Sequence, residues 1–352
     1  MKIPARNILI RCPNWVGDAV MATPALRCIR EHCPDARISL LAKPYVRGAL
    51  ENAPWADEII EYDPDRAHRG WLGYLALIER LRVRHFDLAV IMPHSLSAAW
   101  MAWLAGARRR VGYSRGDRGW LLTDRLPSPR EGRTWLPVPK TDYYLRLCET
   151  IGCPVRSTKT ELFVSDSAAQ QADRMLAQRG VPPDALVIGL NPGARFGSSK
   201  CWSPKSFAQV ADALIERYGC RVVILSAPDE DQIVRAIELE MKHKAVDFLD
   251  EPMTLELLKP IVRRLALLVT TDTGTRHFAV AFDKPVVVIM GPTDPRHTAC
   301  NLDKTTVLRV DVPCGPCHLR VCPTDHRCMT LVTPDHVLAA VDDLMRKHVP
   351  RS

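Results

Sequence analysis

The sequence predicts an α/β protein made of two doubly wound parallel-sheet domains. Three observations support this prediction: short apolar runs alternate with segments of helical length, this scheme occurs twice, and 352 residues exceed the usual size of one domain. Apolar runs separated by helix-length segments are typical of βαβ units, whose strands lie parallel in one sheet. With 47% hydrophobic and 25% charged residues, the chain has the composition of a folded globular protein.

Apolar runs in both halves of the chain are expected to form the strands. Four lie in the first half, at residues 8–10, 38–41, 58–60 and 88–91, and five in the second half, at 186–190, 221–225, 246–248, 267–269 and 286–289. Helices of the second half are expected over residues 206–218, 230–242, 255–264 and 276–282, with a final helix over 334–348. These segments have helical length and lie between or after the strand-like runs.

The boundary between the two domains is expected near residue 165. Residues 126–140 are rich in proline and charge, and residues 152–166 lack helical periodicity, so the linker is expected within 155–175. We therefore expect an N-terminal domain over residues 1–165 and a C-terminal domain over 166–352. Two such domains would leave a cleft between facing strand ends, which suits a reaction with two substrates.

Charge and cysteine content limit the classes of function. The formal net charge of +8 indicates an acidic partner, which could be nucleic acid, a phosphorylated sugar or an anionic membrane surface. The first residues contain no apolar segment of signal-peptide length, and no apolar run reaches the roughly 18 to 20 residues that span a bilayer. A cytoplasmic protein is therefore expected, with its 12 cysteines as reduced thiols or metal ligands.

Several common enzyme motifs do not occur in the sequence. No G-x-G-x-x-G follows a strand-like run, and there is no P-loop, kinase, H-E-x-x-H or G-x-S-x-G signature. These absences argue against dinucleotide-dependent oxidoreductases, P-loop enzymes and α/β-hydrolases.

Polar turns follow two of the strands expected in the second half. The segments TDTGTRH at 271–277 and GPTDP at 291–295 each come after an apolar run. Because ligands bind outside the carboxyl ends of parallel strands and helix N-termini attract anions, we expect these turns to bind a nucleotide diphosphate. The candidate residues are Asp272, Thr273, Gly274, His277 and Thr293. Taken singly, Asp272 could instead bond its own backbone in a turn, and His277 could be a buried helix residue.

A third loop, residues 191–202, follows another strand-like run and precedes a helix. It offers small residues, two hydroxyls and a lysine, which together can neutralise a diphosphate leaving group without a metal. Its candidate residues are Asn191, Gly193, Ser198, Ser199 and Lys200. The alternative is a solvated loop whose Arg195 and Lys200 contact nothing.

Asp18 follows the first expected strand, within the segment RCPNWVGDAV at 11–20. On the edge facing the second domain, its carboxylate could take a proton from a sugar hydroxyl. The alternative is that Asp18 caps the following helix, a common role for aspartate that spacing alone favours.

Four cysteines form a block near the C-terminus. Cys314 and Cys317 have the spacing C-x₂-C, and Cys322 and Cys328 the spacing C-x₅-C. Four thiolates are compatible with a tetrahedral structural zinc site, although the second pair is wider than usual, and a surface loop of reduced cysteines is the alternative. A catalytic metal is not expected here, because four thiolates leave no open coordination position.

Basic residues cluster in the first half, at 108–110 and within 115–133, with Trp120 and Trp135 nearby. Such a mixture could hold a phosphorylated acceptor, lie on an anionic bilayer or bind single-stranded nucleic acid. Most runs of this kind are solvated surface.

Together these segments resemble the bacterial lipopolysaccharide heptosyltransferases of glycosyltransferase family nine, most closely the heptosyltransferase II branch. The resemblance lies in residues 14–26, 191–202, 272–295 and 314–329. It implies a GT-B architecture and metal-independent, inverting transfer of L-glycero-D-manno-heptose from ADP-heptose onto the heptose-Kdo inner core of lipopolysaccharide. The first domain would hold the acceptor, heptosyl-Kdo-lipid A, and the second the ADP-sugar.

The resemblance also implies roles for single residues. Asp18 would be the general base, Lys200 the cation facing the diphosphate, and Glu230 a carboxylate near the adenosine ribose. The other residues expected to bind the donor are Asn191, Gly193, Ser198, Ser199, Asp272, Thr273, Gly274, His277 and Thr293. Which of the two serines contacts phosphate is left open.

Two alternative functions remain. A sibling transferase, similar to heptosyltransferase I or III, would use a different core acceptor. A protein of another class would bind nucleic acid through the basic first domain and a zinc knuckle, but its cysteines lie far along the chain from the arginine clusters. For the transferase we expect no nucleic-acid partner, no cofactor required for catalysis, and loose attachment to the cytoplasmic face of the inner membrane through basic and aromatic side chains.

Overall fold

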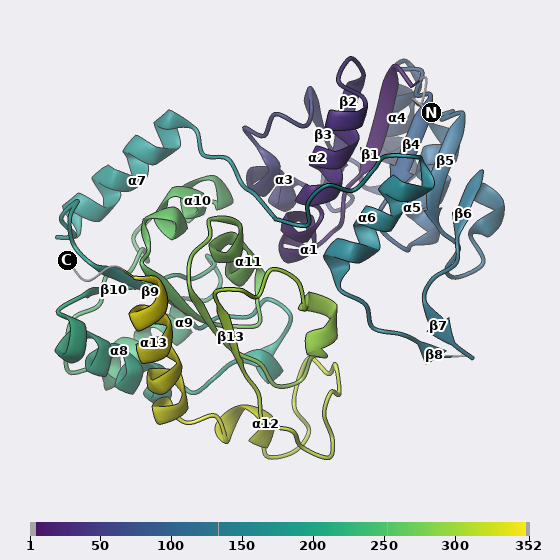
Figure 1. The fold of residues 1–352 in the computed structure, drawn as a ribbon. Coiled ribbons are helices and arrows are strands. Elements are labelled where there is room, and N and C mark those ends of the chain that lie inside the picture. The colour runs from purple at the N-terminus through teal and green to yellow at the C-terminus, as the bar shows by residue number, and fades with distance from the viewer. Residues whose placement is uncertain (1–4, 133, 252, 350–352) are drawn as a thin grey trace. The chain divides into compact units, whose positions relative to one another are not determined.

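The computed structural model describes residues 5–132, 134–251 and 253–349, and the chain divides into two compact units (Figure 1). The first unit extends to Phe163 and also includes Arg296–Cys300, while the second comprises Val164–Pro295 and the residues from Asn301 onward. The short segment returns to the first unit where the thiol of Cys300 lies 3.7 Å from Oδ1 of Asp142. Each unit contains its own parallel sheet, so the predicted two-domain α/β fold is confirmed.

The first unit contains a six-stranded sheet in the order β3-β2-β1-β4-β5-β6, and every neighbouring pair of strands is parallel. The strands are β1 Asn7–Arg11, β2 Arg37–Ala42, β3 Glu58–Glu61, β4 Leu88–Ile91, β5 Arg109–Tyr113 and β6 Asp124–Leu126. The first four confirm the expected strands. β5 was not expected because it begins with Arg109 and Arg110 and resembles basic surface; Arg109 instead pairs with Asp124 of β6 at 2.7 Å.

Helices cover both faces of this first sheet. They are α1 Val16–Met21, α2 Thr23–His32, α3 Pro44–Leu50, α4 Gly70–Arg82, α5 Leu96–Leu104 and α6 Lys140–Thr150. One core cluster joins the sheet to α1, α2, α3 and α6, and a second joins its other face to α4 and α5. Alternate strand residues feed the two clusters, as with Ile8 and Leu9 of β1, because successive side chains point to opposite faces. A 3₁₀ turn, η1 Gly119–Leu121, and a small antiparallel pair, β7 Arg130–Glu131 with β8 Thr134–Trp135, complete the unit.

The second unit contains a five-stranded parallel sheet in the order β10-β9-β11-β12-β13. The strands are β9 Val187–Asn191, β10 Arg221–Ile224, β11 Leu267–Thr271, β12 Val286–Ile289 and β13 Thr305–Leu308. The expected strand at 246–248 is wrong, since Val246 makes only an isolated bridge with Val223. The side chain of Asp247 accepts a hydrogen bond from the backbone N–H of Leu249, which turns the chain directly after that bridge.

Helices also cover both faces of the second sheet. They are α7 Asp166–Gln178, α8 Pro204–Tyr218, α9 Asp231–Glu240, α10 Leu255–Arg264, α11 Gly274–Ala281, α12 Arg327–Thr330 and α13 Pro334–His348, with 3₁₀ turns η2 Ser198–Lys200 and η3 Pro295–Thr298. α8, α9 and α13 share one core cluster with the sheet. On the other face Gly189 of β9 leaves room for Leu265, which follows α10. Among the described residues, no helix is both long and apolar enough to cross a bilayer.

Parallel pairing determines where the candidate loops lie. β9, β11 and β12 are neighbours in the sheet, and their carboxyl ends are Asn191, Thr271 and Ile289. The loops that leave these three ends therefore meet at one edge of the sheet.

Candidate active site

Asp272 is the centre of a buried ion cluster at the carboxyl end of β11. Its Oδ2 accepts hydrogen bonds from Lys200 Nζ and Thr293 Oγ1, both at 2.7 Å. Its Oδ1 accepts one from Arg276 Nη1 at 2.9 Å, and Lys200 Nζ also donates to the carbonyl oxygen of Asp272 at 2.8 Å. Three separate loops thus meet on one carboxylate, and the alternative of a Lys200 that contacts nothing is wrong.

The ion cluster joins two cationic side chains to one carboxylate. Burial by itself raises the pKa of Asp272, but the charges of Lys200 and Arg276 hold that pKa well below its usual range, so the carboxylate is ionised. Two cations then face one anion, and because the three side chains are at most 12% exposed, water screens them weakly. Two largely buried cations beside a helix N-terminus suit an anionic ligand.

His277 lies on α11 beside this ion cluster and is buried. Burial, and after it the charge of Arg276, lowers the pKa of His277 to about 3. The imidazole is therefore neutral at neutral pH and does not add to the positive charge of the cluster.

The N-terminus of α11 is held against the end of β9. Thr273 occupies the N-cap position, and its Oγ1 donates to Asn191 Oδ1 at 2.9 Å. The Asn191 Nδ2 in turn donates to the carbonyl oxygen of Leu225 at 2.8 Å. The first N–H groups of a helix have no acceptor within it, and they attract anions. Asn191 and Thr273 thus position the N-terminus of α11 next to the ion cluster.

Glu230 lies against Gly193 in the loop after β9. Its Oε2 accepts a hydrogen bond from the backbone N–H of Ala227 at 2.9 Å, and burial raises the pKa of Glu230. The Gly193 carbonyl accepts a bond from Thr271 Oγ1 at 3.0 Å. The structure therefore brings Gly193 and Glu230 to the same sheet edge as Asp272.

The two serines of the loop have different surroundings. Ser198 is exposed, whereas Ser199 is 2% exposed and its Oγ donates to the carbonyl oxygen of Leu319 at 2.5 Å. The carbonyl oxygen of Ser199 accepts a bond from His326 Nε2 at 2.6 Å. Since the Ser199 hydroxyl is used by the protein itself, Ser198 is the better candidate for a contact with a ligand.

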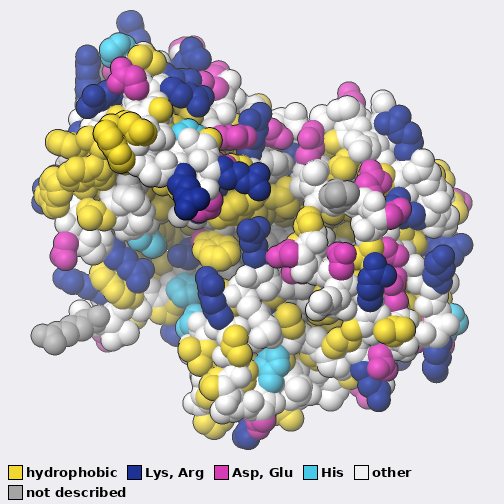
Figure 2. All heavy atoms as spheres, turned by 180° about the vertical axis from the view of Figure 1, so that it is seen from behind, with side chains coloured by type: hydrophobic (Ala, Val, Ile, Leu, Met, Phe, Trp, Pro, Cys, Tyr) yellow, Lys and Arg dark blue, Asp and Glu magenta, His cyan; other side chains and the backbone are white. Residues whose placement is uncertain are grey.

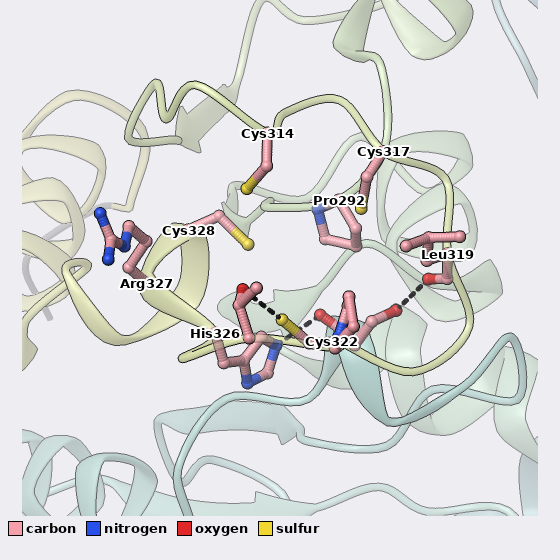
Figure 3. Close-up of a pocket in the computed structure, with 11 residues that line it drawn as sticks. Pro292, Cys314, Cys317, Leu319, Cys322, His326, Arg327 and Cys328 are labelled. Atoms are coloured by element: carbon pink, nitrogen blue, oxygen red, sulfur yellow. Dashed lines mark hydrogen bonds between the residues drawn. The ribbon is translucent and has the colours of Figure 1, made fainter.

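The cysteine block packs on the loops of this site. Figure 3 shows Cys314, Cys317, Cys322 and Cys328 around one pocket, together with Pro292. The block is bonded to the 291–293 turn, since His318 N–H donates to the Pro292 carbonyl at 2.9 Å. In the ranges that the structure describes, no three or more His, Cys, Asp or Glu side chains are arranged to hold a metal ion. Zinc binding by the block remains a prediction from spacing.

In the first unit, Asp18 follows the carboxyl end of β1 as the third residue of α1. The N-cap residue is Trp15, so the alternative that Asp18 caps this helix is wrong. Asp18 is half-buried, and its charge acts on Tyr144, whose pKa is raised first by burial and then by Asp18.

Much of the basic sequence in the first unit has structural roles. Arg118 is fully buried and its guanidinium donates to the carbonyl oxygens of Tyr113 and Pro93. Arg110 Nε donates to the carbonyl oxygen of Leu121 at 2.6 Å. These arginines hold loops of the first unit and are not simply solvated surface.

Comparison with known proteins places the chain in a family. The family model described as glycosyltransferase family 9 (heptosyltransferase) matches residues 74–327. The chain belongs to glycosyltransferase family 9. A relative named lipooligosaccharide heptosyltransferase 2 from Haemophilus influenzae is 27% identical over 313 residues, which cover 86% of this chain and 88% of the relative. This glycosyltransferase is thus of the heptosyltransferase type.

Solved structures show the same fold. A glycosyltransferase family 9 structure from Veillonella parvula matches with a TM-score of 0.86 at 20% identity, covering 99% of both chains. A structure described as Escherichia coli ADP-heptose lps heptosyltransferase II matches with a TM-score of 0.78 at 24% identity, covering 97% of this chain and 99% of that one. The glycosyltransferase therefore has the GT-B architecture that the resemblance implied.

Sequence reasoning did not assign a role to two arginines of this glycosyltransferase. Arg276 binds Asp272 and could have been found from the i, i+4 spacing of opposite charges at a helix start. Arg309, which follows β13, donates from Nη1 to the carbonyl oxygens of Gly291 and Thr293, at 3.1 and 2.7 Å. No local pattern indicates this second contact.

Proposed function

We propose that the protein transfers L-glycero-D-manno-heptose from ADP-heptose onto the heptose-Kdo inner core of lipopolysaccharide, with inversion at the anomeric carbon. The observation that carries the proposal is the ion cluster of Lys200, Asp272 and Arg276 beside the N-terminus of α11. Its two cationic side chains and the helix N-terminus suit a diphosphate, and the names of the similar proteins point to a heptose donor and a lipopolysaccharide acceptor.

The second domain is proposed to bind the donor. Lys200, the Ser198 hydroxyl and the backbone N–H groups at Thr273 and Gly274 would contact the diphosphate, while Glu230 would accept bonds from the adenosine ribose. Asn191, Gly193, Asp272 and Thr293 would hold these groups in place, and His277 would stay neutral beside the donor. Charge stabilisation of the departing ADP would come from the protein itself, so no metal is needed in this scheme.

The first domain is proposed to bind the acceptor and to supply the base. Asp18 would take the proton from the attacking hydroxyl of the acceptor. Because Asp18 and Lys200 belong to different domains, the reaction requires both domains to engage the two substrates at once, which also excludes water. The acceptor is lipid-linked, and we propose that the enzyme works at the cytoplasmic face of the inner membrane.

A donor and acceptor screen tests the proposed function. Thermal shift with ADP, UDP and GDP compounds should show selective stabilisation by ADP-heptose. Incubation with ADP-heptose and a series of truncated lipopolysaccharides should then give one heptosylated product by mass spectrometry, with the heptose-Kdo core as acceptor. Product only on a Kdo core, or only on a longer core, would assign the sibling activities instead. No stabilisation by any ADP compound would refute the donor assignment.

A further inference from the structure

Helix α5 is apolar except for one exposed hydroxyl side chain, Ser97. The segment LSAAWMAWL contains no charged residue, and its Ala98, Ala99, Met101 and Ala102 are buried in the core beneath the sheet. The opposite side exposes Leu96, Trp100 and Trp103, which are 51%, 37% and 44% exposed. Their spacing of i, i+4 and i+7 places them on one face. A surface helix normally turns polar side chains outward, so this outer face requires an explanation.

Two neighbouring elements extend the apolar face. Trp120 of η1 is 59% exposed and packs edge-on against Trp100, with ring centroids 5.7 Å apart. The ring centroids of Trp103 and Trp100 lie 5.2 Å apart. We call Leu96, Trp100, Trp103 and Trp120 the tryptophan surface. α4 packs beside α5 and exposes further apolar side chains at Trp71, Leu72 and Leu75. Figure 2 shows hydrophobic side chains gathered at its left on the first unit, with Lys and Arg side chains around them.

Arginines border the tryptophan surface. Arg82 at the end of α4 is exposed, and its Nε donates to the carbonyl oxygen of Leu104, the last residue of α5, at 2.7 Å. Arg125 is exposed next to η1, where its Nε donates to the Leu122 carbonyl. Arg108, which is 83% exposed at its side chain, follows α5 in sequence. The apolar centre therefore has a cationic edge.

We infer that the tryptophan surface docks the first domain on an anionic lipid surface. Indole rings favour the boundary between headgroups and acyl chains, and arginines beside them attract anionic headgroups. The apolar side chains of this patch can enter the bilayer interface, and the net charge of +8 attracts the protein to a negatively charged lipid surface. This inference rests on the proposed function, because docking would place the acceptor-binding domain where a lipid-linked acceptor is found.

Vesicle binding tests the inference directly. The wild-type chain should sediment with vesicles of phosphatidylglycerol and phosphatidylethanolamine, bind phosphatidylcholine vesicles less, and show a blue shift of tryptophan emission on binding. The triple variant Trp100→Ser, Trp103→Ser, Trp120→Ser should lower the partition coefficient at least about tenfold. Leu239→Ser is the matched control, since Leu239 is 87% exposed on α9 of the other unit, and it should bind as the wild type does.

A second variant tests the inference even if the triple variant misfolds. Arg82→Glu with Arg125→Glu removes no tryptophan, and it should weaken binding to anionic vesicles while the protein still unfolds in a cooperative thermal transition. Equal vesicle binding by wild type and both variants, or no binding by wild type, would overturn the inference. A wild-type dimer by light scattering that the triple variant converts to monomer would assign the surface to a second copy instead.

Activity separates this inference from the proposed function. With a deacylated, soluble core oligosaccharide as acceptor, the triple variant should turn over as the wild type does. With the same core embedded in vesicles, its turnover should fall. If the wild type makes no product from either acceptor, the proposed function fails whatever the vesicles show. If both proteins work equally on embedded acceptor, only the docking surface fails.

Discussion

Gly193 lies so close to Glu230 that a Cβ at position 193 would overlap the Glu230 carboxylate. Any other residue type at position 193 would displace the Glu230 carboxylate, whose Oε2 accepts a hydrogen bond from Ala227 N–H. The glycine thus allows Glu230 to reach the carboxyl edge of the sheet, where the ribose of the donor is proposed to bind.

Gly193→Ala should displace Glu230 and weaken ADP binding about tenfold or more, because ribose hydroxyls would lose a buried acceptor. Isothermal titration with ADP measures this effect. Gly119→Ala is the matched control, since a Cβ there meets Ser114 at an ordinary 3.7 Å. Unchanged ADP affinity in Gly193→Ala would show that Glu230 does not contribute to donor binding.

Lys200→Gln should lower kcat/KM about 10²- to 10³-fold, as expected when a preorganised charge facing a leaving group is removed. The fold should persist, because Asp272 keeps its bonds from Arg276 and Thr293. Steady-state kinetics and thermal unfolding together check both statements. The control Lys205→Gln removes an exposed lysine of α8 and should change neither kcat/KM nor the thermal stability.

Asp18→Asn should reduce turnover about 10²- to 10⁴-fold, the usual contribution of a general base, while ADP affinity stays as in the wild type. Asp35→Asn, at an exposed position of the same unit, is the control. Wild-type turnover in Asp18→Asn would mean that another group takes the proton.

Ser198 and Ser199 offer a matched pair. Ser199→Ala should cost about 1 kcal/mol of unfolding free energy, because the Leu319 carbonyl loses its donor. Ser198→Ala should change stability by less than about 0.5 kcal/mol but weaken ADP binding. Chemical denaturation and ADP titration of both variants check this. The reverse pattern would assign the phosphate contact to Ser199.

Acid should destabilise the second unit through His277. Burial and the Arg276 charge lower its pKa to about 3, so below the unfolded value near 6.5 only the unfolded chain takes up a proton. Stability is therefore complete above about pH 6.5 and decreases as the pH falls toward 3, by about 2 kcal/mol at pH 5. Denaturation at pH 7.5 and pH 5 should show a smaller loss in His277→Asn than in wild type. His243→Asn, an exposed histidine of the same unit, should lose as much as the wild type does.

Strands that are buried on both faces of the sheet could be predicted from sequence, because such burial requires a continuous run of hydrophobic residues. β1, β2, β4, β9 and β12 are of this kind. β5 escaped prediction because its first two residues are arginines whose charges are met by Asp124 and by backbone carbonyls, contacts that no local pattern reveals. The segment around Val246 resembled a strand because Val246 is apolar and does pair with Val223, but through a single bridge. The pairing ends there because the Asp247 side chain accepts a hydrogen bond from Leu249 N–H, which turns the chain.

For the site, the sequence by itself determined the loops, the family resemblance and the residue types that could meet a diphosphate. It could do so because parallel strands deliver their following turns to one edge. Only the tertiary structure decided the partners within that edge. Lys200 binds a carboxylate 72 positions away, and Ser199 a carbonyl 120 positions away. Such contacts depend on how distant segments of the chain pack together, and they cannot be predicted from the spacing of residues along the sequence.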